Sequence, residues 1–64
     1  MVVYIVKKTG AEIKWVHTNA YTAVKHIQRL LEKGGTDASL EEILKGDYDF
    51  VFKIDKMQVM DVFD

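Results

Sequence analysis

The chain of 64 residues has no cysteine, no proline, one serine and two histidines. Without cysteine there is neither a disulfide nor a thiolate metal site, and two isolated histidines are a poor basis for a zinc cluster. Nucleophilic catalysis needs an activated Ser, Cys, Thr or Lys beside a base, and the only serine, Ser39, lies in a helix-capping pattern. The sequence therefore predicts a protein that is not an enzyme and needs no metal or cofactor.

Long apolar runs are also absent: no uninterrupted run approaches the 18 residues that a membrane-spanning helix requires. Hydrophobic residues make up 48% and charged residues 30% of the chain, which is typical of a folded domain. We expect one domain over residues 1–64, and a cytoplasmic location because a chain without cysteine suits a reducing compartment. On folding, a domain of this size buries only about 60% of the surface that its unfolded chain exposes. It is therefore expected to need support from a partner or from self-association.

The charges are divided along the chain. Residues 1–33 carry six Lys and Arg against two acids, a balance of +4, and residues 34–64 carry three Lys against eight acids, a balance of −5. Such asymmetry affects how fast the protein meets a partner, and in which orientation, more than it affects the fold.

The first half predicts a β-hairpin followed by a helix. Residues 2–8 are apolar on both alternating sides, which is typical of an interior strand, and residues 11–17 form the returning strand after a turn at Thr9 and Gly10. Residues 20–33 place apolar side chains three and four apart, which predicts an amphipathic helix. Thr18 or Asn19 can cap its start, and the pair of glycines at 34 and 35 can end it.

The second half predicts a short helix and one or two strands. Ser39 and Glu42 have the spacing of a capping box, in which the serine hydroxyl accepts from the Glu42 amide and the glutamate returns to the Ser39 amide. Residues 48–55 alternate between apolar and polar, which predicts a strand with the side of Tyr48 and Phe50 facing inward. Beyond it, either a turn at residues 55–56 leads to a fourth strand or a bulge bends one long strand. We favour the turn.

Together these elements predict an α+β fold of order ββααββ: a mostly antiparallel sheet of three or four strands with the long helix on one face and a short second helix. One helix covers only one face of the sheet, and monomers rarely expose a large apolar patch. We therefore expect a homodimer that associates through the other face. The residues assigned to this surface are Tyr4, Val6, Val51, Val59 and Met60.

The acidic half suggests a surface for a protein partner. Carboxylates lie on or beside the predicted terminal strands and alternate with aromatic residues, a pattern that suits a basic groove on another protein. Carboxylates along an edge strand also prevent aggregation, and the sequence leaves both roles open. The predicted partner-binding residues are Asp47, Tyr48, Asp49, Asp55 and Asp61.

The basic half suggests an alternative, a nucleic-acid surface with Trp15 or Tyr21 as a stacking group. The net charge of −1 and the single arginine disfavour it, and the same residues also fit the solvated face of an amphipathic helix. The residues of this alternative are Lys14, Lys25, His26, Arg29 and Lys33.

In size and general type the chain resembles the small accessory proteins of bacteria and their phages, many of which inhibit a larger enzyme by binding it. The resemblance implies a non-enzymatic interaction module that inhibits or regulates a larger protein.

Overall fold

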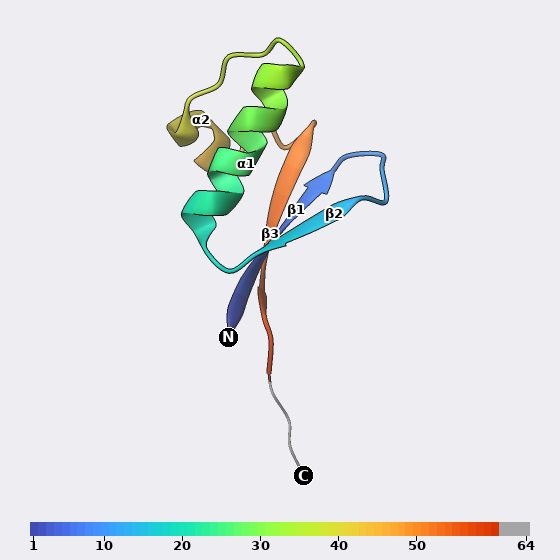
Figure 1. The fold of residues 1–64 in the computed structure, drawn as a ribbon, viewed down its shortest axis with the longest axis vertical. Coiled ribbons are helices and arrows are strands. Elements are labelled where there is room, and N and C mark those ends of the chain that lie inside the picture. The colour runs from blue at the N-terminus through green and yellow to red at the C-terminus, as the bar shows by residue number, and fades with distance from the viewer. Residues whose placement is uncertain (61–64) are drawn as a thin grey trace.

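The structure is a computed structural model and describes residues 1–60. Its elements are β1 (Val2–Lys8), β2 (Lys14–His17), α1 (Ala20–Lys33), α2 (Leu40–Leu44) and β3 (Phe52–Gln58). The strands form one antiparallel sheet of order β2-β1-β3, and α1 lies across one face with α2 beside it (Figure 1). This confirms the predicted α+β class and its single long helix, with three strands rather than four in the part of the chain described.

Strand β1 occupies the centre of the sheet, as its apolar pattern predicts. Val6 lies opposite Trp15 on one side and opposite Ile54 on the other, and all three side chains pack on the face that α1 covers. Because side chains alternate along a strand, Val3 and Ile5 lie on the uncovered face.

Helix α1 begins and ends where the sequence predicts. The side-chain oxygen of Asn19 accepts the backbone N–H of Tyr21 at 2.7 Å and so caps the first turn. At the other end Gly35 has a φ of +86°, a conformation that glycine adopts without steric cost. The residues that α1 buries are Ala23, Val24, Ile27 and Leu31.

The core joins every layer of the fold. Val6 of β1 is completely buried and Ile27 of α1 is 1% exposed, and Ile43 of α2 and Phe52 of β3 complete the cluster. The predicted placement of three self-association residues is therefore wrong. Val6 belongs to this core and Tyr4 packs against it, because the even-numbered residues of β1 face the helix. Val51, in the turns before β3, also packs against the core.

Strand β2 is shorter than predicted and begins at Lys14 rather than at residue 11. The N–H of Ala11 donates to the carbonyl of Lys8 at 3.1 Å, and Gly10 has a φ of +81°. The turn therefore takes up residues that the alternating pattern assigned to the strand, and Ile13 is left exposed.

Strand β3 also differs from the prediction. The N–H groups of Val51 and Phe52 both donate to the carbonyl of Tyr48 at 2.9 Å, so the predicted start of the strand is a series of turns. The strand then stays paired with β1 through Asp55 and Lys56, which excludes the turn that we favoured there. The far end of the predicted fourth strand lies outside the described residues.

Gly46 gives a test of this turn region. Its φ is +86°, and a Cβ there would lie 3.0 Å from a carboxylate oxygen of Asp49. Gly46→Ala is expected to destabilise the protein by about 1–2 kcal/mol in urea unfolding, because the left-handed conformation disfavours a Cβ. Gly34 is the matched control, since its φ of −83° suits any residue and a Cβ would meet only ordinary contacts. Equal losses in the two variants would contradict the assigned backbone conformation.

Candidate functional site

Five of the eight acidic residues of the second half lie in one continuous segment that contains α2. Residues 37–51 carry five acids against one lysine, a balance of −4, whereas residues 1–36 have six basic residues against two acids, a balance of +4. We call residues 37–51 the acidic segment. The five acids are Asp37, Glu41, Glu42, Asp47 and Asp49.

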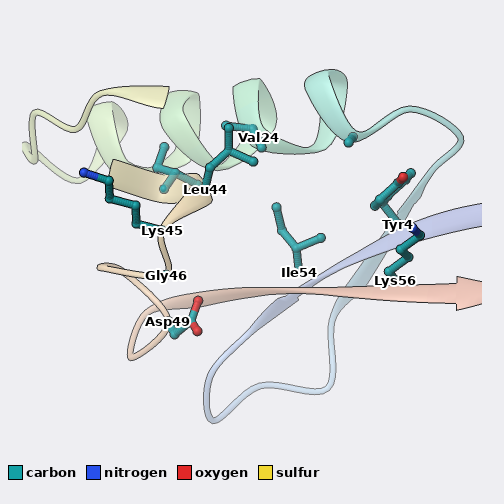
Figure 2. A pocket seen from close by; sticks show the side chains of 10 residues that line it. Tyr4, Val24, Leu44, Lys45, Gly46, Asp49, Ile54 and Lys56 are labelled. Carbon is teal, nitrogen blue, oxygen red and sulfur yellow. The ribbon is translucent and has the colours of Figure 1, made fainter. Parts of the chain in front are cut away.

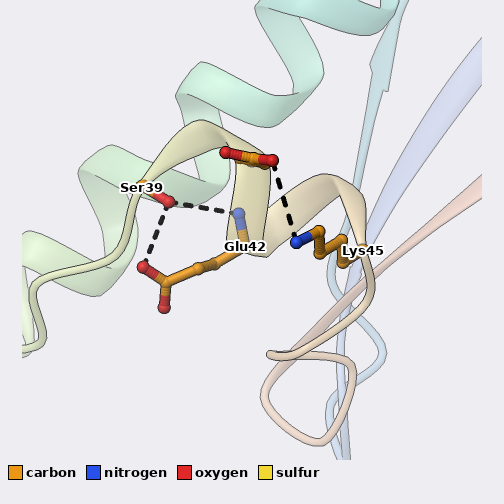
Figure 3. Close-up of polar contacts among 4 residues, drawn as sticks. Ser39, Glu42 and Lys45 are labelled. Carbon is orange, nitrogen blue, oxygen red and sulfur yellow. Dashed lines mark hydrogen bonds and ion pairs between the residues drawn. The ribbon is translucent and has the colours of Figure 1, made fainter.

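The capping box fixes the orientation of α2 within this segment (Figure 3). The N–H of Glu42 donates to the Ser39 hydroxyl at 3.2 Å, and this hydroxyl donates to the Glu42 carboxylate at 3.1 Å. The sequence predicted that the Glu42 carboxylate would return to the Ser39 amide, but in the structure it contacts the serine hydroxyl instead. Lys45, the single lysine of the segment, lies 3.7 Å from the carboxylate of Glu41.

Tyr48 connects the two ends of the acidic segment. Its hydroxyl lies within hydrogen-bond distance of a Glu42 carboxylate oxygen, at 3.2 Å, and of the Asp37 carbonyl, at 3.3 Å. Partial burial and the charges of Glu42, Asp47 and Asp37 raise the pKa of the Tyr48 phenol. Three carboxylates therefore lie close enough to act on one side chain.

Two large apolar side chains are exposed beside these carboxylates. Phe50 is 72% exposed and Leu44 is 68% exposed, and the Phe50 ring lies 6.2 Å from that of Tyr48. Exposed apolar groups among charges of one sign are a feature of binding surfaces. We call this region the acidic-aromatic surface, and it consists of Leu44, Asp47, Tyr48, Asp49 and Phe50.

A cleft of about 310 Å³ opens next to this surface, between the two helices and β3 (Figure 2). Asp49 stands at one end of it, and Lys56 lies with Tyr4 at the other. Its volume is at the small end of the range for ligand sites, so the cleft is large enough for an apolar side chain of a partner. The apolar residues that line it are Tyr4, Ala20, Val24, Ile43, Leu44 and Ile54.

The structure separates the five predicted partner-binding residues. Asp47, Tyr48 and Asp49 lie together, whereas Asp55 lies in β3 and forms an ion pair with Lys7. The hydrogen bond from Lys7 lowers the pKa of the Asp55 carboxyl. Asp61 lies outside the described residues.

The uncovered face of the sheet is apolar in one part and charged in another. Val3 pairs with Met57 and Ile5 pairs with Val16, which places four apolar side chains on this face. Val16 is 65% exposed, and Met57 is also exposed. The charged residues of the face are Lys7, Lys14, Lys53 and Asp55. Val59 and Met60 of the predicted self-association set are exposed just beyond β3.

A basic notch lies on the other side of α1, where the end of β2 meets the helix. The ring nitrogens His17 Nε2 and His26 Nδ1 are 2.9 Å apart, and the Trp15 ring meets that of His26 edge-on with centroids 5.0 Å apart. Burial lowers the pKa of His26, and the charges of His17, Arg29 and Lys33 lower it further. The notch has a volume of about 380 Å³ and is lined by His17, Thr22, Lys25, His26 and Arg29.

The notch contains three of the five residues of the nucleic-acid alternative. Lys25, His26 and Arg29 line it and Lys33 lies near enough to act on His26, but Lys14 is on the uncovered face of the sheet. Of the two stacking groups that the alternative named, Trp15 packs against the core, whereas Tyr21 is 59% exposed.

Sequence reasoning missed the pairing of His17 with His26. A local signal was present, because His17 follows Trp15 by two residues and therefore shares its side of the strand. The helix begins only three residues after His17, which brings its first turns over that side.

No protein-family model, curated protein or solved structure matches this chain. Of the two helices within residues 1–60, neither is long and apolar enough to cross a membrane. Over the same residues, no three His, Asp or Glu side chains converge as metal ligands would. Fold and surface therefore define the class of this protein: a small α+β domain of order ββααβ, with an acidic-aromatic surface on one side of its long helix and a basic notch on the other.

Proposed function

We propose that this protein is a non-enzymatic interaction module that inhibits or regulates a larger protein by binding a basic surface on it. The contact is the acidic-aromatic surface. The observation that carries the proposal is the exposure of Phe50 and Leu44 within a segment whose balance of charge is −4.

The position of the carboxylates supports binding over protection of a sheet edge. β3 is an edge strand, and carboxylates within it would deter pairing with another chain. Asp47 and Asp49, however, precede β3, which begins at Phe52. Of the residues predicted for the partner site, only Asp55 lies within the described edge strand, and it is paired with Lys7.

The chemistry of the surface indicates the kind of partner. Exposed aromatic side chains supply most of the binding energy in many interfaces, and surrounding charges of one sign speed association with an oppositely charged surface. A basic groove that binds nucleic acid has this complementary charge. A domain bound there would compete with the nucleic acid, which is the inhibitory form of the proposal, in a cytoplasmic setting.

Affinity capture with two charge-reversal variants tests the proposal. Asp47→Lys/Asp49→Lys and Lys25→Glu/Arg29→Glu each reverse two exposed charges, the first pair in the acidic-aromatic surface and the second pair in the basic notch. The tagged wild-type chain and the Lys25/Arg29 variant are expected to retain the same protein from a lysate, in a manner that weakens with salt, and the Asp47/Asp49 variant is expected to lose it. Loss of that protein with the Lys25/Arg29 variant alone would contradict the assignment. Circular dichroism of each variant controls for folding.

We also propose that two copies associate through the apolar part of the uncovered sheet face, formed by Ile5, Val16 and Met57 around Val3, which is itself buried. This revises the predicted set, because Tyr4, Val6 and Val51 are taken up by the core. The support is the exposure of Val16 and Met57 beside the partly exposed Ile5.

Sedimentation at two salt concentrations tests self-association. Val16→Asp is expected to weaken the dimer by about tenfold or more, because burying an unpaired charge costs more than the 1.4 kcal/mol that this factor represents. Leu44→Asp makes the same type of change on α2 and is expected to leave the dimer unchanged. A wild-type chain that is monomeric at high micromolar concentration would refute the proposal.

A further inference from the structure

We propose that the basic notch binds the phosphate group of a small phosphorylated molecule. This inference is independent of the acidic-aromatic surface, which lies on the other side of α1. It rests on the residues that line the notch: two histidines, a lysine and an arginine with one threonine, and no carboxylate among them.

The two permanent cations of the notch lie on one face of the helix. Lys25 and Arg29 are four residues apart, a spacing that places their side chains next to each other. The guanidinium of arginine offers paired donors that match the oxygens of a phosphate. Thr22 contributes shape rather than a donor, because its hydroxyl already donates to the carbonyl of Asn19 at 2.9 Å.

The histidine pair is expected to make anion binding in the notch depend on pH. Across the 2.9 Å contact one ring nitrogen donates a hydrogen and the other accepts it, which requires the accepting nitrogen to carry no proton. The permanently charged groups that act on His26 are Arg29 and Lys33 of α1, and these two cations and the neighbouring ring of His17 all disfavour a proton on the His26 ring. Tyr4 of β1, which pairs with His17, contributes a phenol rather than a carboxylate or an amine. A bound anion reverses this balance, because an opposite charge nearby favours the charged imidazolium.

The same positive charges disfavour a metal ion. Two imidazole nitrogens facing each other resemble part of a transition-metal site, but Lys25, Arg29 and Lys33 would repel a divalent cation. An anion is attracted by every one of these groups. A volume of about 380 Å³ exceeds that of a phosphate group alone and leaves room for part of the molecule that carries it.

Nuclear magnetic resonance of the full chain tests the inference, with the imidazole protons of His17 and His26 as reporters. Inorganic phosphate and a nucleoside monophosphate are each expected to cause saturable shifts at both rings and at the amides of residues 22–29. Arg29→Gln is expected to weaken binding about tenfold, since a hydrogen bond to a charged group contributes about 1.5–3 kcal/mol. Lys53→Gln removes the same charge on the uncovered sheet face and is expected to change nothing.

Two further experiments complete the test. The first distinguishes a small phosphorylated molecule from a nucleic acid, and the second tests the role of the histidines. A short single-stranded oligonucleotide is expected to bind no more tightly than the monophosphate. Because phosphate esters titrate near pH 6, sulfate, whose charge is constant over this range, serves as the probe of pH. Sulfate affinity is expected to rise as the pH falls through the pKa of His26, and His26→Gln is expected to abolish this dependence.

Three results would overturn the inference. The first is equal weakening by Arg29→Gln and Lys53→Gln, which would mean that phosphate is attracted by overall charge only. The second is binding of the oligonucleotide alone with a steep dependence on salt, which would favour a nucleic-acid surface instead. The third is an affinity for sulfate that does not change with pH.

Discussion

Replacing Ile27 by alanine is expected to leave most of the chain unfolded at room temperature. Ile27 is 1% exposed and belongs to the cluster that joins α1 to the sheet and to α2. Removing so much of a buried side chain costs about 2–5 kcal/mol, and a core of this size rarely supplies more than about 3–5 kcal/mol in total. Far-ultraviolet circular dichroism during urea titration measures the loss.

Two variants complete this test. Ile13→Ala makes the same change at a residue that is 57% exposed, and it is expected to alter stability by no more than about 0.5 kcal/mol. Ile27→Val keeps most of the buried volume and is expected to cost about 0.5–1.5 kcal/mol. An Ile27→Ala protein that unfolds at the same urea concentration as the Ile13→Ala protein would show that the core lies elsewhere.

The double variant Phe50→Ala/Leu44→Ala is expected to bind the captured partner about a hundredfold more weakly than the wild type. Anchoring side chains at interfaces each cost about 1–2 kcal/mol or more when truncated, and a hundredfold corresponds to about 2.8 kcal/mol. Both side chains are largely exposed, so their truncation is expected to leave the fold intact. Isothermal titration calorimetry against the purified partner gives the change in affinity.

Tyr21→Ala is the matched control for these anchors, because Tyr21 is an aromatic residue of similar exposure on the basic helix. It is expected to bind the partner with the wild-type affinity. If Tyr21→Ala weakens binding as much as the double variant does, the contact does not centre on the acidic-aromatic surface.

The elements that sequence reasoning located well are those whose signals are local. Helix α1 has an apolar stripe, an asparagine cap and terminal glycines, and its observed bounds are the predicted ones. The Ser39–Glu42 box marks the start of α2 for the same reason, since each interaction spans only one turn. The apolar character of both sides of β1 likewise indicated its central position in the sheet.

The predictions that failed depended on competition between local patterns and on contacts distant in sequence. Residues 48–51 alternate as a strand does, but Gly46 and the hydrogen bonds to the Tyr48 carbonyl hold them in turns. The alternation of β1 allowed either set of side chains to face the helix, and the sequence interpretation placed Val6 on the wrong face. The pairing of His17 with His26 depends on how β2 and α1 pack, which neither segment specifies alone.

The sequence indicated which kinds of residue form the candidate surfaces, but it did not indicate where in the fold each of these residues lies. The division of charge between the two halves was visible in the sequence, but within the described part of the second half the negative balance lies in residues 37–51, whereas residues 52–60 carry two lysines and one aspartate, a balance of +1. Asp55 was grouped with Asp47 and Asp49 because of its type, and register places it instead beside Lys7 on the uncovered face.

Amide hydrogen exchange of the full chain, with and without the captured partner, tests the central claim most directly. Binding through the acidic-aromatic surface predicts slowed exchange within residues 37–51, with the amides of β2 and of the basic side of α1 unchanged. Slowed exchange confined to residues 22–33 or to the strands of the uncovered face would contradict it.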